Sequence, residues 1–203
     1  MTIARKVLLL LCASFTSAVL LPGTSNAALV GTLQQISPLA ASYTEGVDFR
    51  VFEILDDGTV STGDVTASLF AVDLGSVDSG CDAADFAGFT AGAIALIERG
   101  GCDFSLKVNN ARDAGAVGTL VFDDSQELFP RVGLTDPTDI PALFLTRDLG
   151  LTFFNSLLQS GETVVRLAVT EVAQAPEPSI LGLFATGLTL LGLGHRKRLA
   201  RRR

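Results

Sequence analysis

The sequence predicts an α/β fold, in which parallel strands alternate with helices that cover the sheet. Two apolar runs, 93–98 and 116–122, have the length of strands and are apolar on both faces, as in a sheet covered on both sides. The segment between them, 104–114, has the apolar spacing of an amphipathic helix. A strand, a helix and a strand in this order favour a parallel pair joined by a right-handed crossover.

The ends of this first helix are marked in the sequence. Asp103 is placed to cap the first turn, and Gly115 can supply a left-handed stop. The stripe expected to face the core consists of Phe104, Val108, Ala111 and Gly115. Lys107 and Arg112 lie off this stripe.

Further strands are expected on both sides of this unit. Apolar or β-branched runs separated by turn residues predict strands at 28–36, 49–55, 67–72, 140–145 and 163–170. Pro141 near the start of its strand suggests an edge position, because proline cannot donate to a sheet. A second helix opens at Thr146 or Asp148 and ends near Ser160-Gly161, with four residues turned inward: Leu149, Phe153, Leu157 and Leu158. The polar loop 123–139 is the expected rim of any binding surface.

The first 27 residues have the form of a secretory signal peptide. A basic start is followed by an apolar core and by the small-residue site Ser25-Asn26-Ala27, after which cleavage is expected. The alternative is a retained membrane helix, which the short core and Pro22-Gly23 disfavour. Export through this signal would involve a signal peptidase.

The last 28 residues form three consecutive parts. Pro176-Glu177-Pro178 precedes sixteen uncharged, mostly apolar residues at 179–194, and a basic tail follows at 195–203. Such a helix would span roughly 24 Å, slightly less than the hydrocarbon core, and the basic tail would hold its end in the cytoplasm. This ending resembles the PEP-CTERM sorting signal of Gram-negative bacteria, which implies recognition and removal of the tail by an exosortase. An ordinary tail anchor is the alternative.

Without its two ends, the chain is strongly acidic. Of 15 Lys and Arg, two lie in the signal and six after the apolar span, which leaves seven against 22 Asp and Glu and a formal charge of −15. A body of this charge will not bind nucleic acid through its general field. Only Cys81 and Cys102 lie in the body, and in an oxidising compartment they are expected to form a disulfide.

The middle of the chain resembles a protease-associated (PA) domain over about residues 75–171. The matching features are a cysteine before the first strand, Ile94 to Glu98 ending in Arg99-Gly100, Cys102 with Phe104 two residues on, and Lys107; further on, Ala111-x-x-Ala114-Gly115-Ala116, Gly118 to Phe122, and Ile140-Pro141-Ala142 leading through Arg147 and Gly150 into the second helix. The resemblance implies a swivelling β/β/α domain, an open β-barrel or sandwich with flanking helices. It also implies a non-catalytic role in recognising a substrate or partner.

These features divide the chain into six parts: the signal peptide 1–27, a strand-rich segment 28–74, the PA domain 75–171, a linker 172–178 with the sorting motif, a transmembrane helix 179–194 and a basic tail 195–203. The only histidine, His195, lies in the tail, so no histidine-based catalytic or metal site is expected in the body. The sequence therefore predicts a protein that is not an enzyme and needs no cofactor or metal.

The expected function is binding. The protein would be sorted to the cell surface, outer membrane or extracellular matrix, with a transient membrane anchor, and would bind a protein, peptide or polysaccharide. Candidate partner-binding residues are Arg99, Lys107, Phe129 and Arg131. Alternatives left open are a structural acidic matrix protein without a specific ligand and an accessory subunit of a separate protease.

Overall fold

Three stretches of the chain, residues 27–54, 61–124 and 132–173, are described by a computed structural model, and all of them belong to one compact unit, Ala27–Gln174. The predicted signal peptide, sorting motif, membrane helix and basic tail lie outside the described residues, apart from Ala27. No helix within the described stretches is long and apolar enough to cross a membrane. These four expectations therefore stay predictions.

The described chain forms a mixed α/β fold, as predicted. Its helical elements are the short 3-10 helix η1 (Ala83–Phe86) and the α-helices α1 (Phe104–Asp113) and α2 (Arg147–Ser160). Its strands are β1 (Ala27–Ser37), β2 (Ala41–Ser42), β3 (Phe49–Val51), β4 (Glu53–Ile54), β5 (Gly63–Val72), β6 (Ile94–Glu98), β7 (Gly118–Phe122), β8 (Gly133–Leu134), β9 (Ala142–Leu145) and β10 (Val164–Ala173).

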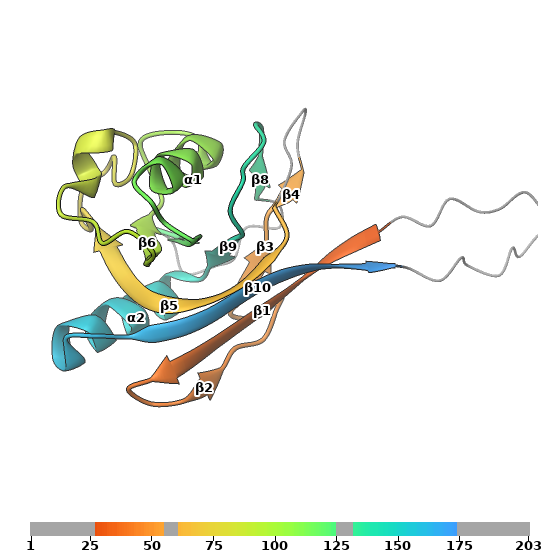
Figure 1. Ribbon diagram of the computed structural model, residues 1–203, viewed down its shortest axis with the longest axis horizontal. Helices are drawn as coiled ribbons and strands as arrows, with labels where there is room; N and C mark the ends of the chain where they lie inside the picture. Colours follow the sequence, from red (N-terminus) through yellow and green to blue (C-terminus); the bar gives the residue numbers. More distant parts are fainter. Residues whose placement is uncertain (1–26, 55–60, 125–131, 174–203) are drawn as a thin grey trace, which may run out of the picture. The chain divides into compact units, whose positions relative to one another are not determined.

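Eight strands form one sheet in the order β2-β1-β10-β5-β6-β7-β9-β3 (Figure 1). The four central strands β5, β6, β7 and β9 run parallel, and the pairs on either side of them are antiparallel. The parallel β6–β7 pair, joined through α1, confirms the predicted strand–helix–strand unit. β4 and β8 form a separate parallel pair.

The sheet curls until strands from its two halves meet. A Cβ added at Gly31 in β1 would lie 2.7 Å from the ring of Phe49 in β3, so the two strands approach closely although they lie far apart in the sheet order. Only a residue without a side chain leaves room for this approach. The curled sheet with two helices agrees with the predicted open, barrel-like architecture.

The two helices cover opposite faces of the parallel strands. Phe144 of β9 meets Phe104 of α1, with ring centroids 5.5 Å apart, and register pairing places Val121 on the same face. The next residue of β7, Phe122, points to the other face, where α2 packs so tightly that a Cβ at Gly150 would lie 2.2 Å from its ring. Both faces are therefore buried, which is why these strands are apolar throughout.

Most element positions agree with the sequence, and two details are wrong. Pro141 precedes β9, which lies between β7 and β3, so this strand is internal and β3 is the edge. The proline is tolerated because it precedes the first paired residue, Ala142. Leu158 is 67% exposed, whereas Leu149 and Phe153 are buried as expected, because 149, 153 and 157 already complete the inward stripe of α2.

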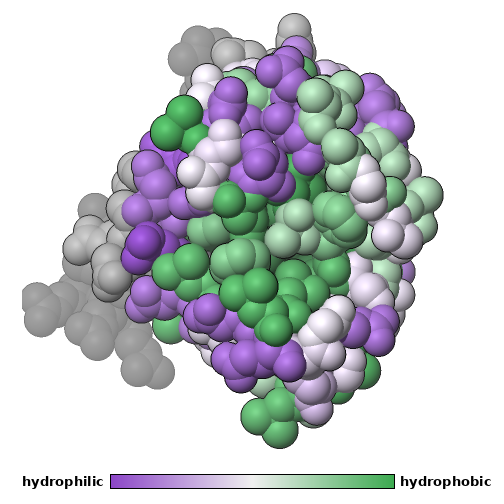
Figure 2. All heavy atoms as spheres, turned by 90° about the vertical axis from the view of Figure 1, so that its left-hand side faces the viewer, coloured by the Kyte–Doolittle hydropathy of each residue, from purple (hydrophilic) through white to green (hydrophobic). Residues whose placement is uncertain are grey.

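One face of the unit is partly apolar. In the view from the left-hand side of Figure 1, apolar residues gather in a hollow that polar residues border (Figure 2). This face carries η1 and the last turn of α2, where Leu158 lies (Figure 1).

Candidate functional site

The candidate site begins at the turn that follows β6. Here Gly100 and Gly101 both have positive φ angles, 129° and 72°, which favour glycine. A Cβ on Gly100 would lie 2.6 Å from the carbonyl oxygen of Val77, and one on Gly101 would lie 2.7 Å from Cα of Asp78. The two glycines therefore allow the loop before η1 to pack directly on the turn.

A disulfide ties the same two segments together. Cys81 and Cys102 are bonded, with their Cα atoms 5.8 Å apart, which confirms the pairing expected from the sequence. The bond closes a loop of 21 residues that contains all of η1 and β6. The loop 75–81 is thus held covalently against the start of α1.

Lys107 supports this loop from beneath. Its side chain is fully buried, and its ammonium group donates to the Ser79 carbonyl oxygen and lies 3.5 Å from Sγ of Cys81. Burial lowers the pKa of Lys107 to about 8, although the carboxylates of Asp85, Asp78 and Glu98 act in the opposite direction. The expectation that Lys107 lies off the buried stripe is wrong, because the loop 75–81 covers that side of α1.

Asn110, one turn further along α1, completes this contact. Its amide donates to the carbonyl oxygens of Gly80, at 3.1 Å, and Cys81, at 2.8 Å. Ser79 is equally well held, since its hydroxyl donates to the Val72 carbonyl at 2.6 Å. Backbone groups that a buried loop would otherwise leave unsatisfied are therefore paired.

Arg99 lies at the surface end of the turn. Its guanidinium Nη1 lies 3.1 Å from Oδ1 of Asp123 and 3.4 Å from Oδ1 of Asp124, both of which follow β7. The Arg99 side chain is 31% exposed, whereas that of Asp123 is fully buried. The ion pair thus joins the ends of two neighbouring parallel strands.

A pocket of about 270 Å³ opens between these segments. Its lining comes from the loop before η1, the turn after β6 and the segment after β7: Gly75, Ser76, Val77, Glu98, Arg99, Gly100, Gly101 and Asp124. The Glu98 carboxylate accepts from the Gly75 amide at 3.0 Å, which holds one wall, and Val77 is 82% exposed. The pocket combines an apolar side chain, a partly exposed cation and carboxylates, groups suited to holding a short stretch of polypeptide.

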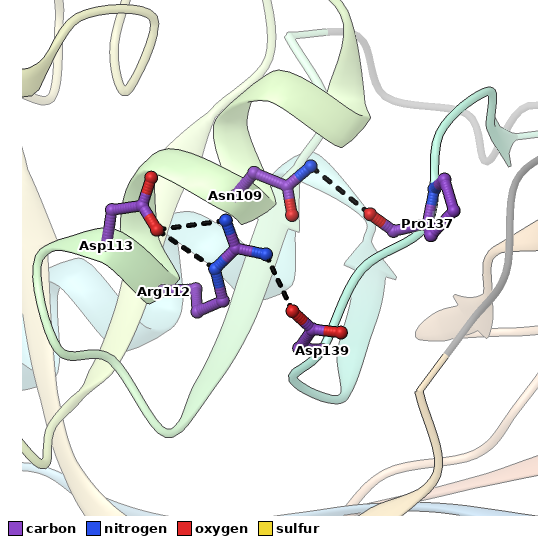
Figure 3. Close-up of polar contacts among 5 residues, drawn as sticks. All are labelled: Asn109, Arg112, Asp113, Pro137 and Asp139. Atoms are coloured by element: carbon purple, nitrogen blue, oxygen red, sulfur yellow. Dashed lines mark hydrogen bonds and ion pairs between the residues drawn. The ribbon is translucent and has the colours of Figure 1, made fainter.

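The opposite side of α1 holds the loop between β8 and β9 (Figure 3). Arg112 Nη1 lies 2.8 Å from Asp139 Oδ2, and Asn109 Nδ2 donates to the Pro137 carbonyl oxygen at 3.3 Å. The buried Ser105 hydroxyl accepts from the amides of Thr135 and Asp136, at 2.9 and 3.0 Å. α1 therefore anchors the loop 75–81 on one side and, on the other, part of the loop 123–139 that the sequence placed at the rim of a binding surface.

The structure describes two of the four candidate partner-binding residues. Arg99 lines the pocket, Lys107 is buried beneath it, and Phe129 and Arg131 lie outside the described residues. The sequence did not predict the supporting roles of Ser105, Asn109 and Asn110. A signal was present, because Asn-Asn in the middle of a helix is unfavourable unless the amides bond to something nearby.

Within the described stretches, no group of three or more His, Cys, Asp or Glu residues is arranged to hold a metal ion. The carboxylates of the candidate site are instead committed to Arg99 and to loop amides. The arrangement fits recognition through hydrogen bonds and apolar contact.

Comparison with known proteins relates the chain to peptidases. Residues 65–153 match the model of the PA domain family. An aminopeptidase from Pseudomonas aeruginosa is 37% identical over 135 residues, which cover 61% of this chain and 24% of the aminopeptidase. The C5a peptidase of Streptococcus pyogenes serotype M3 is 38% identical over 102 residues, 50% of this chain and 8% of that protein. The chain therefore spans a quarter or less of these two relatives.

Solved structures share the fold. A zinc aminopeptidase from Bacillus subtilis aligns over 71% of this chain and 31% of its own, with a TM-score of 0.53 and 20% identity. An aminopeptidase from Aneurinibacillus sp. strain AM-1 aligns over 77% and 40%, with a TM-score of 0.52 and 19% identity.

These findings correct one expectation. The prediction of a protein that is not an enzyme is wrong, because the relatives matched in sequence are peptidases and the chain is thereby protease-related. The prediction rests on the absence of a histidine from the body of the chain, and this absence says nothing about which proteins the chain is related to. The matched portion is the part that contains the PA domain.

Proposed function

We propose that this chain, which contains a PA domain at residues 65–153, is an exported, protease-related protein that binds a peptide or protein segment in the pocket beside Arg99. The observation that carries the proposal is the pocket itself, which lies where the loop before η1 meets the ends of β6 and β7. A featureless acidic surface would have favoured the alternative of a structural matrix protein.

The proposed binding uses groups already in place. The exposed side chain of Val77 would contact an apolar side chain of the peptide. Arg99 lines the pocket with a partly exposed side chain, and its positive charge would attract a carboxylate of the peptide. Because the disulfide and Lys107 hold the pocket walls before any ligand arrives, little conformational entropy is lost on binding.

The relation to an aminopeptidase suggests what the bound peptide is for. We propose that the domain holds a polypeptide on which a peptidase acts. The similarity to the Pseudomonas aminopeptidase supports this proposal. A polysaccharide ligand is less suited to the pocket, because the described lining has no aromatic side chain on which a sugar ring could stack.

A fluorescent pool of random decapeptides tests the proposal. Fluorescence anisotropy should detect binding to the full chain, and Val77→Asp should weaken it about tenfold, since an acidic side chain would replace the apolar contact. Leu106→Asp is the matched control, because Leu106 is also an exposed apolar residue, at 45%, and does not line the pocket. Equal binding by both variants would exclude this pocket.

Export and sorting remain part of the proposal. The signal at 1–27 and the motif Pro176-Glu177-Pro178 would direct the protein to the cell surface or matrix of a Gram-negative bacterium after processing by signal peptidase and exosortase. Intact-mass measurement of the secreted protein should show the loss of residues 1–27 and of the segment beyond the motif. A full-length tail recovered from the inner membrane would instead indicate an ordinary anchor.

A further inference from the structure

A second pocket lies next to the edge strand β3. It has a volume of about 270 Å³, and its lining residues are Glu45, Gly46, Arg50, Val51, Glu53 and Val132. None of these residues lines the pocket beside Arg99. The second pocket is therefore a separate feature, and a ligand bound in it would add a function beyond the proposed peptide binding.

The walls of this pocket are held by backbone hydrogen bonds. The Gly46 amide donates to the Phe49 carbonyl at 2.8 Å, which closes the turn before β3. On the other side, the Glu53 amide donates to the Val132 carbonyl at 2.7 Å, where β4 pairs with β8. The backbone segments that carry the lining residues are thus fixed by hydrogen bonds.

Arg50 is the distinctive residue of the pocket. Among the described residues it takes part in no ion pair, and its Nε is shielded from solvent without a hydrogen-bond partner. Leaving a buried donor of a charged group unpaired is costly, and a guanidinium is the side chain best suited to bind a carboxylate through two parallel hydrogen bonds. Arg50 is therefore a group with the capacity to bind a carboxylate in this pocket.

The other charges of the pocket narrow the choice of ligand. Glu45 also lines it, so a carboxylate stands in the same pocket as the guanidinium. Glu45 accepts from the Gly31 amide through one oxygen, at 3.0 Å, and its carboxylate retains capacity for a cationic donor. A simple anion would offer no partner to this carboxylate, whereas a ligand with both a carboxylate and an ammonium group would meet complementary partners.

The volume limits the ligand as well. Pockets for drug-sized ligands enclose roughly 300–1,000 Å³, so this pocket is at the lower limit and suits a small molecule. We propose that the pocket beside β3 binds a free α-amino acid, whose carboxylate pairs with Arg50 and whose ammonium group pairs with Glu45. The apolar side chains of Val51 and Val132 would contact its side chain.

The test is an NMR titration of the full chain, labelled with ¹⁵N, with L-alanine. L-alanine should shift the amide resonances of residues 45–53, and Arg50→Gln should weaken binding by about tenfold or more, the loss expected for a charge-assisted pair. Glu45→Gln should weaken it as well, because the ammonium partner is lost. Arg147→Gln is the matched control, since Arg147 lies at the start of α2 and lines neither pocket.

Sodium acetate and ethylammonium chloride, each carrying half of the proposed ligand, separate the alternatives. Both should bind at least about tenfold more weakly than L-alanine, because each leaves one charged group of the pocket without its partner. Acetate binding as tightly as L-alanine would overturn the amino-acid assignment, and so would the absence of shifts at 45–53. If Arg50→Gln fails to fold, Arg50→Lys keeps the charge without the paired geometry and should also bind more weakly.

Discussion

The ammonium group of Lys107 lies in the protein interior, where it donates to the Ser79 carbonyl next to the disulfide. A lysine at this position is expected on the exposed side of an amphipathic helix. It is buried because the loop 75–81, which precedes the helix in the chain, folds over that side. The role of this residue is to support the loop, and the pocket depends on it indirectly.

The lowered pKa of Lys107 predicts a pH-dependent stability. The folded state titrates near pH 8 and the unfolded chain near the ordinary value of 10.5, so between these values the unfolded state binds more protons. The free energy of unfolding contributed by this group therefore rises as the pH increases from 8 to 10.5. Relative to Lys107→Met, the wild type should gain about 1 to 3 kcal/mol over this range.

Urea denaturation of both proteins at three pH values, about 7.5, 9 and 10.5, measures this difference. Comparing the two proteins cancels the titration of all other groups, including Tyr43, whose pKa is raised by burial and by Asp48. A difference in unfolding free energy that stays constant or falls with pH would show that the pKa of Lys107 is not lowered in the folded state.

Helix α1 holds two loops in place at the scale of secondary structure. One side contacts the loop 75–81 through Lys107 and Asn110, and another contacts the loop 133–139 through Ser105, Asn109 and Arg112. The helix itself begins as the sequence predicted, with the Asp103 carboxylate accepting from the Ser105 amide at 2.8 Å. The polar residues of α1 therefore lie on the sides of the helix that contact these two loops.

Ser105→Ala should destabilise the protein by about 1 to 3 kcal/mol, because the amides of Thr135 and Asp136 would lose the acceptor that the buried Ser105 hydroxyl provides. Arg112→Gln is the control on the same helix. It removes two exposed ion pairs, to Asp113 and Asp139, which contribute little to stability in water. Thermal unfolding of both variants measures which one loses more stability. A larger loss of stability for Arg112→Gln would contradict the assigned role of Ser105.

The Cys81–Cys102 bond acts at the scale of the whole domain. It connects the segment that precedes β6 with the start of α1, so the unfolded chain cannot separate these regions. For a loop of 21 residues, the loss of chain entropy in the unfolded state is worth about 3 kcal/mol. The bond therefore supplies a substantial share of the stability expected for a domain of this size.

The double variant Cys81→Ser/Cys102→Ser should lose about 3 kcal/mol of unfolding free energy, measured by urea denaturation. The wild type in a reducing buffer should lose a similar amount, while the variant should not respond to the reductant. A wild type whose stability is the same with and without reductant would show that the bond contributes nothing to the folded domain.

Local pattern was sufficient for the elements around β6, α1 and β7. Continuous apolar runs, a capping Asp103 and a glycine stop at Gly115 act over a few residues, and each was found where the sequence indicated. The cysteine pairing followed from count and compartment. Of the candidate site, the sequence indicated only Arg99, because this residue directly follows a predicted strand.

Tertiary structure decided the features that depend on contacts between distant segments. The burial of Lys107, the internal position of β9 after Pro141 and the exposure of Leu158 each depend on what packs against a surface. The pocket with Arg50 is formed by residues 45–53 together with Val132, which lies far along the chain from them. Periodicity and propensity report on neighbours along the chain, whereas a pocket is defined by neighbours in space, and only the folded chain brings those together.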